Sequence, residues 1–213
     1  MDRQRQAETR GNKGEPLMAR DAGRPLRADA QRNREKILAA AVHVFTEEGL
    51  DAHFERIAKE AGVGSGTLYR NFPTREALIE AAYRNEVARL CDAVPGLLAS
   101  MSPPEALRAW TRRFIDYATA KLGMADALRA VVASGTNPYA ESHEMIQAAL
   151  SSLMDANTAA GTIRSDISPT DMFAALAGIA LTSAEPAQRG QAERLLDLTL
   201  DGLKPAPPRP PEP

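Results

Sequence analysis

The stretch Glu60-Ala-Gly-Val-Gly-Ser-Gly-Thr-Leu-Tyr-Arg-Asn-Phe72 decides the fold of this chain. Before it, residues 53–61 place apolar side chains at helical spacing. Gly62 follows where a helix stops and the chain turns tightly, a conformation that glycine adopts without steric cost. A second short helix is predicted over residues 64–71, with Leu68 facing inward. Two short helices joined by a glycine turn predict a helix-turn-helix, whose second helix can enter a major groove.

The second of these helices carries hydroxyl, amide and guanidinium groups, and no acidic residue lies between Gly62 and Asn71. Groups of this kind contact phosphates and base edges. Arg75 is also predicted to contact DNA. A cation in the first turn of a helix opposes the helix dipole, and a phosphate partner would explain why it stands there. Polar residues also cover exposed helices that bind no DNA, so the turn alone leaves both interpretations open. The predicted DNA contacts are Ser65, Gly66, Thr67, Tyr69, Arg70, Asn71 and Arg75.

A longer pattern surrounds this turn. Its positions are Ile37-Leu38, Ala40-Ala41, Phe45, Glu48-Gly49, Ile57-Ala58, Ala61-Gly62-Val63, Gly66-Thr67-Leu68-Tyr69, Phe72 and Thr74-Arg75-Glu76-Ala77-Leu78. At this fixed spacing the segment resembles the N-terminal domain of the tetracycline-repressor (TetR) family, which implies a DNA-binding transcriptional regulator. Three positions depart from the family pattern. His53 and Gly64 stand where helix-capping Ser or Thr is usual, and Arg75 replaces a Lys.

Bulk composition bounds the class of protein. The chain has 213 residues, of which 44% are hydrophobic, and this is enough for a core in one or two domains. No apolar run approaches a membrane span, the start lacks the pattern of a signal peptide, and Cys91 is a single cysteine. We therefore expect a cytoplasmic protein with no membrane partner. The whole chain has a net charge of −2, whereas residues 1–90 hold 16 basic and 14 acidic side chains. A DNA-binding surface must therefore be local to this first part of the chain.

The fold class expected is all-α, with four segments. Residues 1–28 are predicted to be a disordered basic arm, which contacts phosphates or is simply solvated, and Met18 is an alternative start. Residues 31–90 form the helix-turn-helix domain, with the motif itself at 53–72. Residues 103–203 form a helical regulatory and dimerisation domain, and residues 205–213 a disordered proline-rich tail.

Particular helices are predicted by their start and stop signals. The first runs from Asp29 or Ala30 to Glu48, and the fourth from Thr74 to about Val94, where Pro95-Gly96 breaks or kinks it and offers a pivot. The helices of the second domain are expected at 103 onward, 123–134, 142–160, 169–183 and 186–203.

The last two predicted helices are apolar on nearly every side. A helix of this kind must be buried on more than one side, and a second subunit is the natural cover. The TetR resemblance also implies a dimer bundle here, and Leu128-Arg129-Ala130, Val132-Ala133-Ser134-Gly135 and residues 161–166 resemble the regulatory domain of SbtR-like repressors. The predicted dimer interface comprises Phe173, Leu176, Ile179, Leu196, Leu200 and Leu203.

A small apolar effector is the remaining predicted partner. The residues that would line its cavity are Trp110, Phe114, Tyr117, Met124 and Met145, and ordinary core packing is the alternative for each. His43, His53 and His143 have no metal-ligand spacing, so we expect neither metal nor cofactor. No catalytic cluster is present, which disfavours an enzyme.

The leading hypothesis is a homodimeric repressor that binds a palindromic DNA operator and is released by the effector. The alternatives are a regulator without a small-molecule ligand, an activator, and a helix-turn-helix protein that binds only other proteins.

Overall fold

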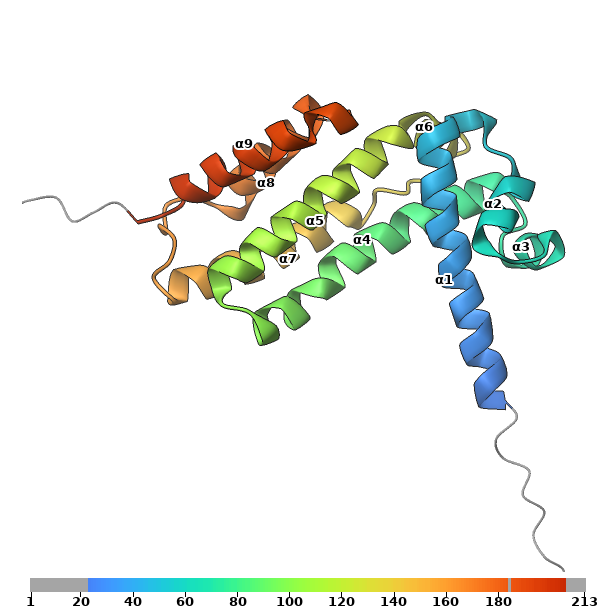
Figure 1. The fold of residues 1–213 in the computed structure, drawn as a ribbon, viewed down its shortest axis with the longest axis horizontal. Coiled ribbons are helices and arrows are strands. Elements are labelled where there is room, and N and C mark those ends of the chain that lie inside the picture. Colours follow the sequence, from blue (N-terminus) through green and yellow to red (C-terminus); the bar gives the residue numbers. More distant parts are fainter. Residues whose placement is uncertain (1–22, 184, 206–213) are drawn as a thin grey trace, which may run out of the picture.

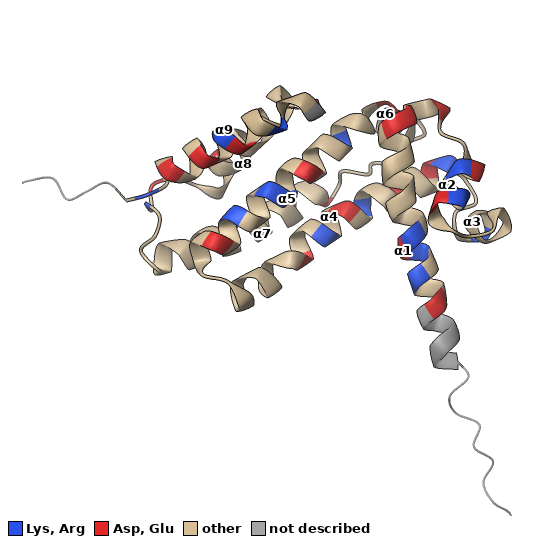
Figure 2. Cartoon of the chain, viewed as in Figure 1, with Lys and Arg blue, Asp and Glu red and all other residues tan. Residues whose placement is uncertain are grey.

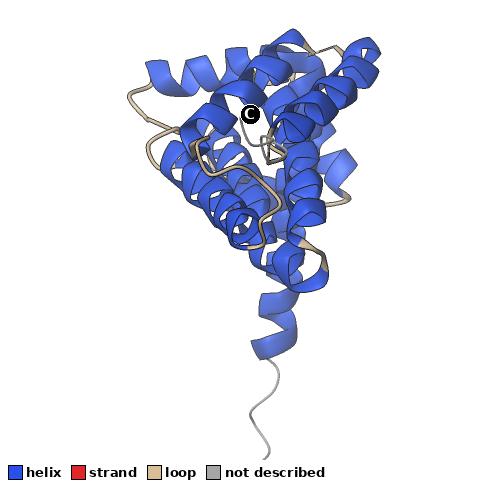
Figure 3. Cartoon of the chain, turned by 90° about the vertical axis from the view of Figure 1, so that its left-hand side faces the viewer, coloured by secondary structure: helices blue, strands red, loops and turns tan. Residues whose placement is uncertain are grey.

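The computed structural model describes residues 23–183 and 185–205, and all regular structure in these residues is helical (Figures 1 and 3). The all-α prediction is thus confirmed. In chain order the elements are α1 (Gly23–Glu48), the 3-10 helix η1 (Gly49–Asp51), α2 (Phe54–Ala61), α3 (Ser65–Asn71), α4 (Arg75–Ser100), α5 (Pro103–Gly123), α6 (Ala125–Ala133), α7 (Ser142–Ala159), α8 (Pro169–Thr182), the 3-10 helix η2 (Pro186–Gln188) and α9 (Arg189–Gly202).

The corner between α2 and α3 forms as the sequence predicts. Gly62 ends α2 at a φ of 66°, and the backbone N–H groups of Gly62 and Val63 donate to the last carbonyls of that helix. Leu68 is fully buried, and α3 packs on α2. His53, at the N-cap of α2, makes no side-chain capping bond, so this departure from the usual pattern leaves the helix start without its side-chain acceptor.

Helix α4 is longer than predicted. Its side-chain cap is Thr74, whose hydroxyl accepts from the N–H of Ala77, and the helix continues past Pro95 to Ser100. Proline inside a helix removes one N–H donor, yet packing retains the helical path, because Val94 and Leu97 on either side are buried in the core. The predicted end at Val94 is therefore wrong. Pro95 also lies far from the helix-turn-helix, which α4 meets at its other end.

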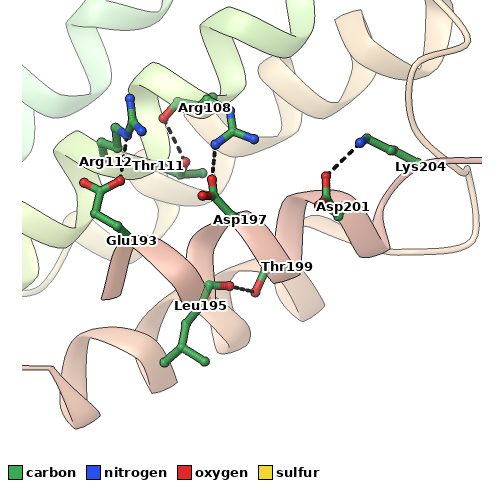
Figure 4. Close-up of polar contacts among 9 residues, drawn as sticks. All are labelled: Arg108, Thr111, Arg112, Glu193, Leu195, Asp197, Thr199, Asp201 and Lys204. Atoms are coloured by element: carbon green, nitrogen blue, oxygen red, sulfur yellow. Dashed lines mark hydrogen bonds and ion pairs between the residues drawn. The ribbon is translucent and has the colours of Figure 1, made fainter. Parts of the chain in front are cut away.

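Helices α5 and α9 run antiparallel and are joined by three surface ion pairs, two of which are drawn in Figure 4. The partners are spaced four residues apart on each helix, so that one row of side chains faces another. The pairs are Arg108 with Asp197, Arg112 with Glu193 at 3.0 Å, and Asp116 with Arg189 at 2.7 Å. We call this set the ion-pair ladder. It joins α9 to α5 along three successive turns.

The elements are arranged so that the helix-turn-helix and the last helix pair lie at opposite ends of the molecule (Figure 1). Helix α1 packs on α2, α4 and α5, and α4 and α5 extend from it toward α7, α8 and α9. One hydrophobic core runs through the described residues from α1 to α9. Within those residues, no helix combines the length and apolar character needed to cross a bilayer.

Two predicted segments differ at their ends. Residues 23–28, predicted to belong to a disordered arm, are the first turns of α1. The rest of that arm, residues 1–22, and residues 206–213 of the predicted tail lie outside the described residues.

Candidate nucleic-acid interface and internal cavity

Six of the predicted DNA contacts lie together on α3. Leu68 turns inward with no exposed surface, which leaves the other faces of this short helix to solvent. We call these six residues the recognition surface; they are Ser65, Gly66, Thr67, Tyr69, Arg70 and Asn71. Five of them are exposed and Thr67 is half-buried. The surface therefore presents donors and acceptors without a carboxylate, a combination that suits a phosphate backbone and base edges.

Hydrogen bonds along α3 hold several of these side chains in place. Arg70 donates from Nε to the Gly66 carbonyl and from Nη2 to Thr67 Oγ1, both at 3.2 Å. Asn71 Nδ2 donates to the Thr67 carbonyl at 2.8 Å. The Tyr69 ring lies 5.1 Å from that of Phe54, at the start of α2. The side chains are thus partly ordered on the free protein, which lowers the entropy lost when they bind.

Arg75 does not belong to this surface. Its guanidinium donates to the carbonyls of Ala52 at 2.7 Å, Leu50 at 2.6 Å and Gly49 at 3.2 Å, and lies 5.3 Å from the centroid of the Phe45 ring. The carbonyl oxygens of η1 and of Ala52 compensate this cation, so a phosphate partner is not needed to explain its place in the first turn of α4. Arg75 ties α4 to η1 across 23 to 26 residues of sequence.

Acidic side chains near the helix-turn-helix lie on α1, η1, α2 and α4 rather than on α3 (Figure 2). Arg56 pairs with Glu47 at 2.7 Å and with Glu48 at 2.8 Å, and His43 lies 2.7 Å from Glu60. These contacts bind α2 to α1 and leave the recognition surface free of negative charge.

A cavity of about 280 Å³ opens among α4, α5, α7 and α8. Its lining combines aromatic rings, aliphatic groups and one lysine, and includes no carboxylate. The lining residues are Tyr83, Phe114, Tyr117, Ala118, Lys121, Leu122, Tyr139, Ser142, His143, Ile146, Phe173, Ala177, Ala180 and Leu181. A mainly apolar pocket with a few convergent polar groups is typical of small-molecule sites.

A chain of hydroxyl groups crosses one wall of this cavity. Ser142 Oγ donates to the Tyr139 carbonyl at 3.0 Å, and the Tyr83 hydroxyl donates to Ser142 Oγ at 2.9 Å. The Tyr117 hydroxyl, 3.1 Å from that of Tyr83, must then be the donor in the remaining bond. Burial raises the pKa of Tyr117 above its ordinary value of 10, and the neighbouring Tyr83 adds to the shift, so the phenol stays protonated.

Only part of the predicted cavity set lines this space. Phe114 and Tyr117 do. Trp110 and Met124 are core residues instead: both are almost fully buried, and Trp110 Nε1 donates to the Leu90 carbonyl at 3.0 Å. Met145 is 36% exposed and lines a separate space of about 80 Å³. For these three residues the cavity prediction is corrected.

The other lining residues were missed because they converge from four helices and one loop. From the sequence, Tyr83 is expected in the core beside α4, and the Lys121 side chain is expected in solvent. Tyr139 lies in the turn between α6 and α7. The only available signal is on α5, where Phe114, Tyr117 and Lys121 share one helical face.

The predicted dimer residues are also largely corrected. Four of them lie inside the protomer with at most 7% exposure, namely Leu176, Ile179, Leu196 and Leu203. Phe173 packs edge-on against Phe114 in the cavity wall. Leu200 is half-buried.

Other side chains of the same two helices face solvent. Leu181 of α8 is 66% exposed and Leu198 of α9 is 69% exposed. Ala174 and Gly178, four residues apart on α8, lie on the same side as Leu181. We call these four residues the C-terminal apolar face.

Comparisons with known proteins agree with this architecture. Residues 37–82 match the model of bacterial regulatory proteins of the tetR family, and residues 102–205 match that of the C-terminal domain of SbtR-like transcriptional regulators. A solved TetR transcriptional regulator from Streptomyces coelicolor is 81% identical with a TM-score of 0.81, and the match covers 82% of this chain and 99% of that one.

More distant relatives show the same fold. A solved TetR transcription regulatory protein from Mycobacterium vanbaalenii is 35% identical with a TM-score of 0.70, covering 85% of this chain and 100% of that one. An uncharacterized HTH-type transcriptional regulator of Bacillus subtilis, YvdT, is 43% identical over 65 residues, which are 30% of this chain and 34% of that protein. The chain thus spans about a third of that curated relative. With the helix-turn-helix, the second helical domain and these full-length matches together, the chain belongs to the TetR family of transcriptional regulators.

Proposed function

We propose that this protein is a sequence-specific, homodimeric DNA-binding repressor that a small molecule releases from its operator. The observation that carries the proposal is the recognition surface, which is polar, largely exposed and free of carboxylates. The buried Leu68 anchors its helix, and the turn at Gly62 joins that helix to α2. This arrangement presents side chains to a major groove at one end of the molecule.

A two-fold dimer supplies the second recognition helix. One helix of seven residues makes few base contacts, whereas two of them double the interface and match a palindromic site. The C-terminal apolar face supports this step, because Leu181 and Leu198 expose large apolar groups on α8 and α9, the helix pair that lies away from α3. Half-sites should then lie about 34–36 Å apart, or a multiple of that spacing.

The cavity supports release by a ligand. Its walls include α4 and α5, and both helices also pack on α1 of the DNA-binding half. A ligand that binds more tightly to one arrangement of these helices shifts the population toward it. A change in the separation of the two recognition helices would then lower operator affinity.

Footprinting on the DNA upstream of the protein's own gene tests the proposal. The protected site should be a near-palindrome, and protection should fall when Thr67 is replaced by Ala. A matched change on α7, Ser152→Ala, should leave protection unchanged. A protein that folds but protects no DNA in its own upstream region at low salt would contradict the assignment.

A further inference from the structure

The cavity differs from an ordinary apolar void in its charge. Lys121 is the one lining residue whose side chain carries a fixed positive charge, and the lining has no Asp or Glu. Its ammonium nitrogen lies 4.9 Å from the centroid of the Tyr139 ring and 5.7 Å from that of Tyr83. Among the described residues, no carboxylate pairs with it. Contacts with ring faces stabilise a cation but leave its three N–H donors without oxygen acceptors.

Three of the four hydroxyls in the lining cannot serve as the main anchor, and the fourth, on Tyr139, is a neutral donor. The protons of Tyr117, Tyr83 and Ser142 are committed along the chain that ends on the Tyr139 carbonyl. The ammonium of Lys121 is therefore the strongest uncommitted donor that faces the cavity. A ligand with a negatively charged oxygen would accept hydrogen bonds from this ammonium group. A charge-assisted hydrogen bond is about twice as strong as a neutral one.

The opposite part of the cavity is mainly apolar, and the one polar ring there is that of His143, which meets the Phe173 ring edge-on at 5.2 Å between centroids. Phe114 and Lys121 lie on the same face of α5, seven residues or about 10 Å apart along the helix axis. Phe114 meets the Phe173 ring edge-on at 5.8 Å between centroids, and Ile146 completes this part of the lining. The space thus has a cationic end and an apolar end. Its volume of about 280 Å³ is near the lower limit for small-molecule sites, which are commonly about 300–1,000 Å³.

We propose that the ligand of this cavity is a small organic monocarboxylate, with its carboxylate on Lys121 and its apolar body between Phe114, Phe173 and Ile146. This proposal rests on the proposed function for its regulatory meaning, since the ligand is taken to be the effector. Binding itself is measured on the protein alone. A neutral ligand of the same shape would leave the ammonium without an acceptor and should bind less well.

The test compares acids with alcohols of matched shape. Sodium octanoate and 1-octanol form one pair, and sodium 4-phenylbutyrate and 4-phenyl-1-butanol form the other. Titration calorimetry on the full-length protein should show that at least one acid binds ten times more tightly than its alcohol. Lys121→Met keeps an apolar stem and removes the charge, so the preference should fall to about one while alcohol binding persists. Lys121→Arg should retain the preference.

Lys204→Met is the matched control, because Lys204 lies at the end of α9 and pairs with Asp201 on the surface. It should leave both affinities unchanged. Should Lys121→Met fail to fold, Lys121→Gln provides the uncharged variant. Equal binding of acid and alcohol to the wild type, no binding of any of the four probes, or a preference that survives loss of the charge would each overturn the proposal.

Operator binding separates this outcome from the proposed function. If the protein protects its operator and none of the acids binds, the ligand class is wrong and the regulator stands. If an acid binds in a Lys121-dependent manner and no DNA is protected, the ligand class stands and the proposed repressor function fails.

Discussion

Arg70 is the side chain of the recognition surface with the greatest reach. In the free protein its guanidinium is held against α3 by the Gly66 carbonyl and the Thr67 hydroxyl. Arg70→Ala should weaken operator binding by about 1–3 kcal/mol if the guanidinium reads a base with two hydrogen bonds. Fluorescence anisotropy with labelled operator measures the loss.

A second arginine gives the matched control for this experiment. Arg164 is exposed in the loop between α7 and α8 and pairs with Asp166 at 2.6 Å. Arg164→Ala should leave operator affinity within about twofold of the wild type, because removing one remote surface charge changes little at a Debye length of about 8 Å. An unchanged affinity in Arg70→Ala would remove Arg70 from the interface.

Arg75 is expected to behave differently, because its hydrogen bonds lie inside the protein. Arg75→Ala leaves the Ala52, Leu50 and Gly49 carbonyls without their donor, and should lower the free energy of unfolding by about 1.5–3 kcal/mol. Urea unfolding measures this loss. Arg84→Ala, on the same helix and paired with Glu80 on the surface, should stay within about 0.5 kcal/mol. Unchanged stability in Arg75→Ala, with a shallower salt dependence of DNA binding, would restore the phosphate contact.

These two arginines show what the sequence can predict at the scale of a residue. The exposure of Arg70 follows from local periodicity, because Leu68 fixes which side of a short helix is buried. The partners of Arg75 lie at least 23 residues away, and no local pattern reports that distance. Lys121 is similar. The local sequence of α5 indicates only a charged residue on a helix, whereas the rings that surround its ammonium group come from α4 and from the turn that contains Tyr139.

At the scale of the element, helix ends with strong local signals were predicted well. Ser168, Pro169 and Asp171 form a capping box with Pro at the first position, and α8 begins there. The end of α4 was missed, because a proline signal was outweighed by burial on both sides of Pro95. Four residues of the predicted dimer set proved to be buried inside the protomer for a related reason: an apolar pattern around α8 and α9 does not tell which side packs on α5 and α7 and which remains uncovered.

The ion-pair ladder gives the prediction at this scale. Arg112→Glu and Glu193→Arg each place like charges opposite each other between α5 and α9, and each should lower the free energy of unfolding. The double variant restores an opposite pair with reversed sign. Its coupling energy should be about 0.2–1 kcal/mol, the range for exposed ion pairs, since these side chains are 51% and 37% exposed.

Thermal and urea unfolding of the four proteins in this cycle measure the coupling at low and high salt. The coupling should shrink at high salt, because the pair lies on the surface. Additive effects of the two single variants would mean that the ladder does not stabilise the packing of α9 on α5.

At the scale of the whole molecule, the proposed dimer rests on the C-terminal apolar face rather than on the leucines predicted first. Leu198→Glu adds a charge to a side chain that is 69% exposed in the protomer, so the fold should survive and the dimer should dissociate. Leu196→Glu, two residues away, places a charge where only 2% is exposed and should unfold the protomer.

Sedimentation velocity and circular dichroism separate these outcomes. Leu198→Glu should sediment as a folded monomer at micromolar concentration, whereas Leu196→Glu should lose helical signal. A Leu198→Glu protein that remains a dimer would move the interface away from this face. A wild type that sediments as a monomer would end the dimer proposal.

Helix α4 connects the cavity to the DNA-binding half of the molecule. Tyr83 lines the cavity, and eight residues earlier, about 12 Å along the axis, Arg75 holds η1 of the DNA-binding half. The Tyr83 hydroxyl also ties α4 to Tyr117 of α5 and Ser142 of α7. A ligand that displaces this contact changes how α4 is held, and hence where its first turn lies. Tyr83→Phe keeps the ring and removes the hydrogen bonds to Tyr117 and Ser142.

Linkage makes this route measurable. Octanoate should raise the operator Kd by a factor of about 5–150, and operator DNA must raise the octanoate Kd by the same factor. In Tyr83→Phe both factors should fall together toward one, with operator affinity in the absence of octanoate little changed. Tyr139→Phe removes a hydroxyl from a part of the lining that is not on α4, so it should alter octanoate affinity without altering the coupling. A Tyr83→Phe protein with the full wild-type coupling factor would show that another helix couples the cavity to the DNA-binding half. Helix α5 is the structural alternative, because its Gly123 lies against Thr46 of α1.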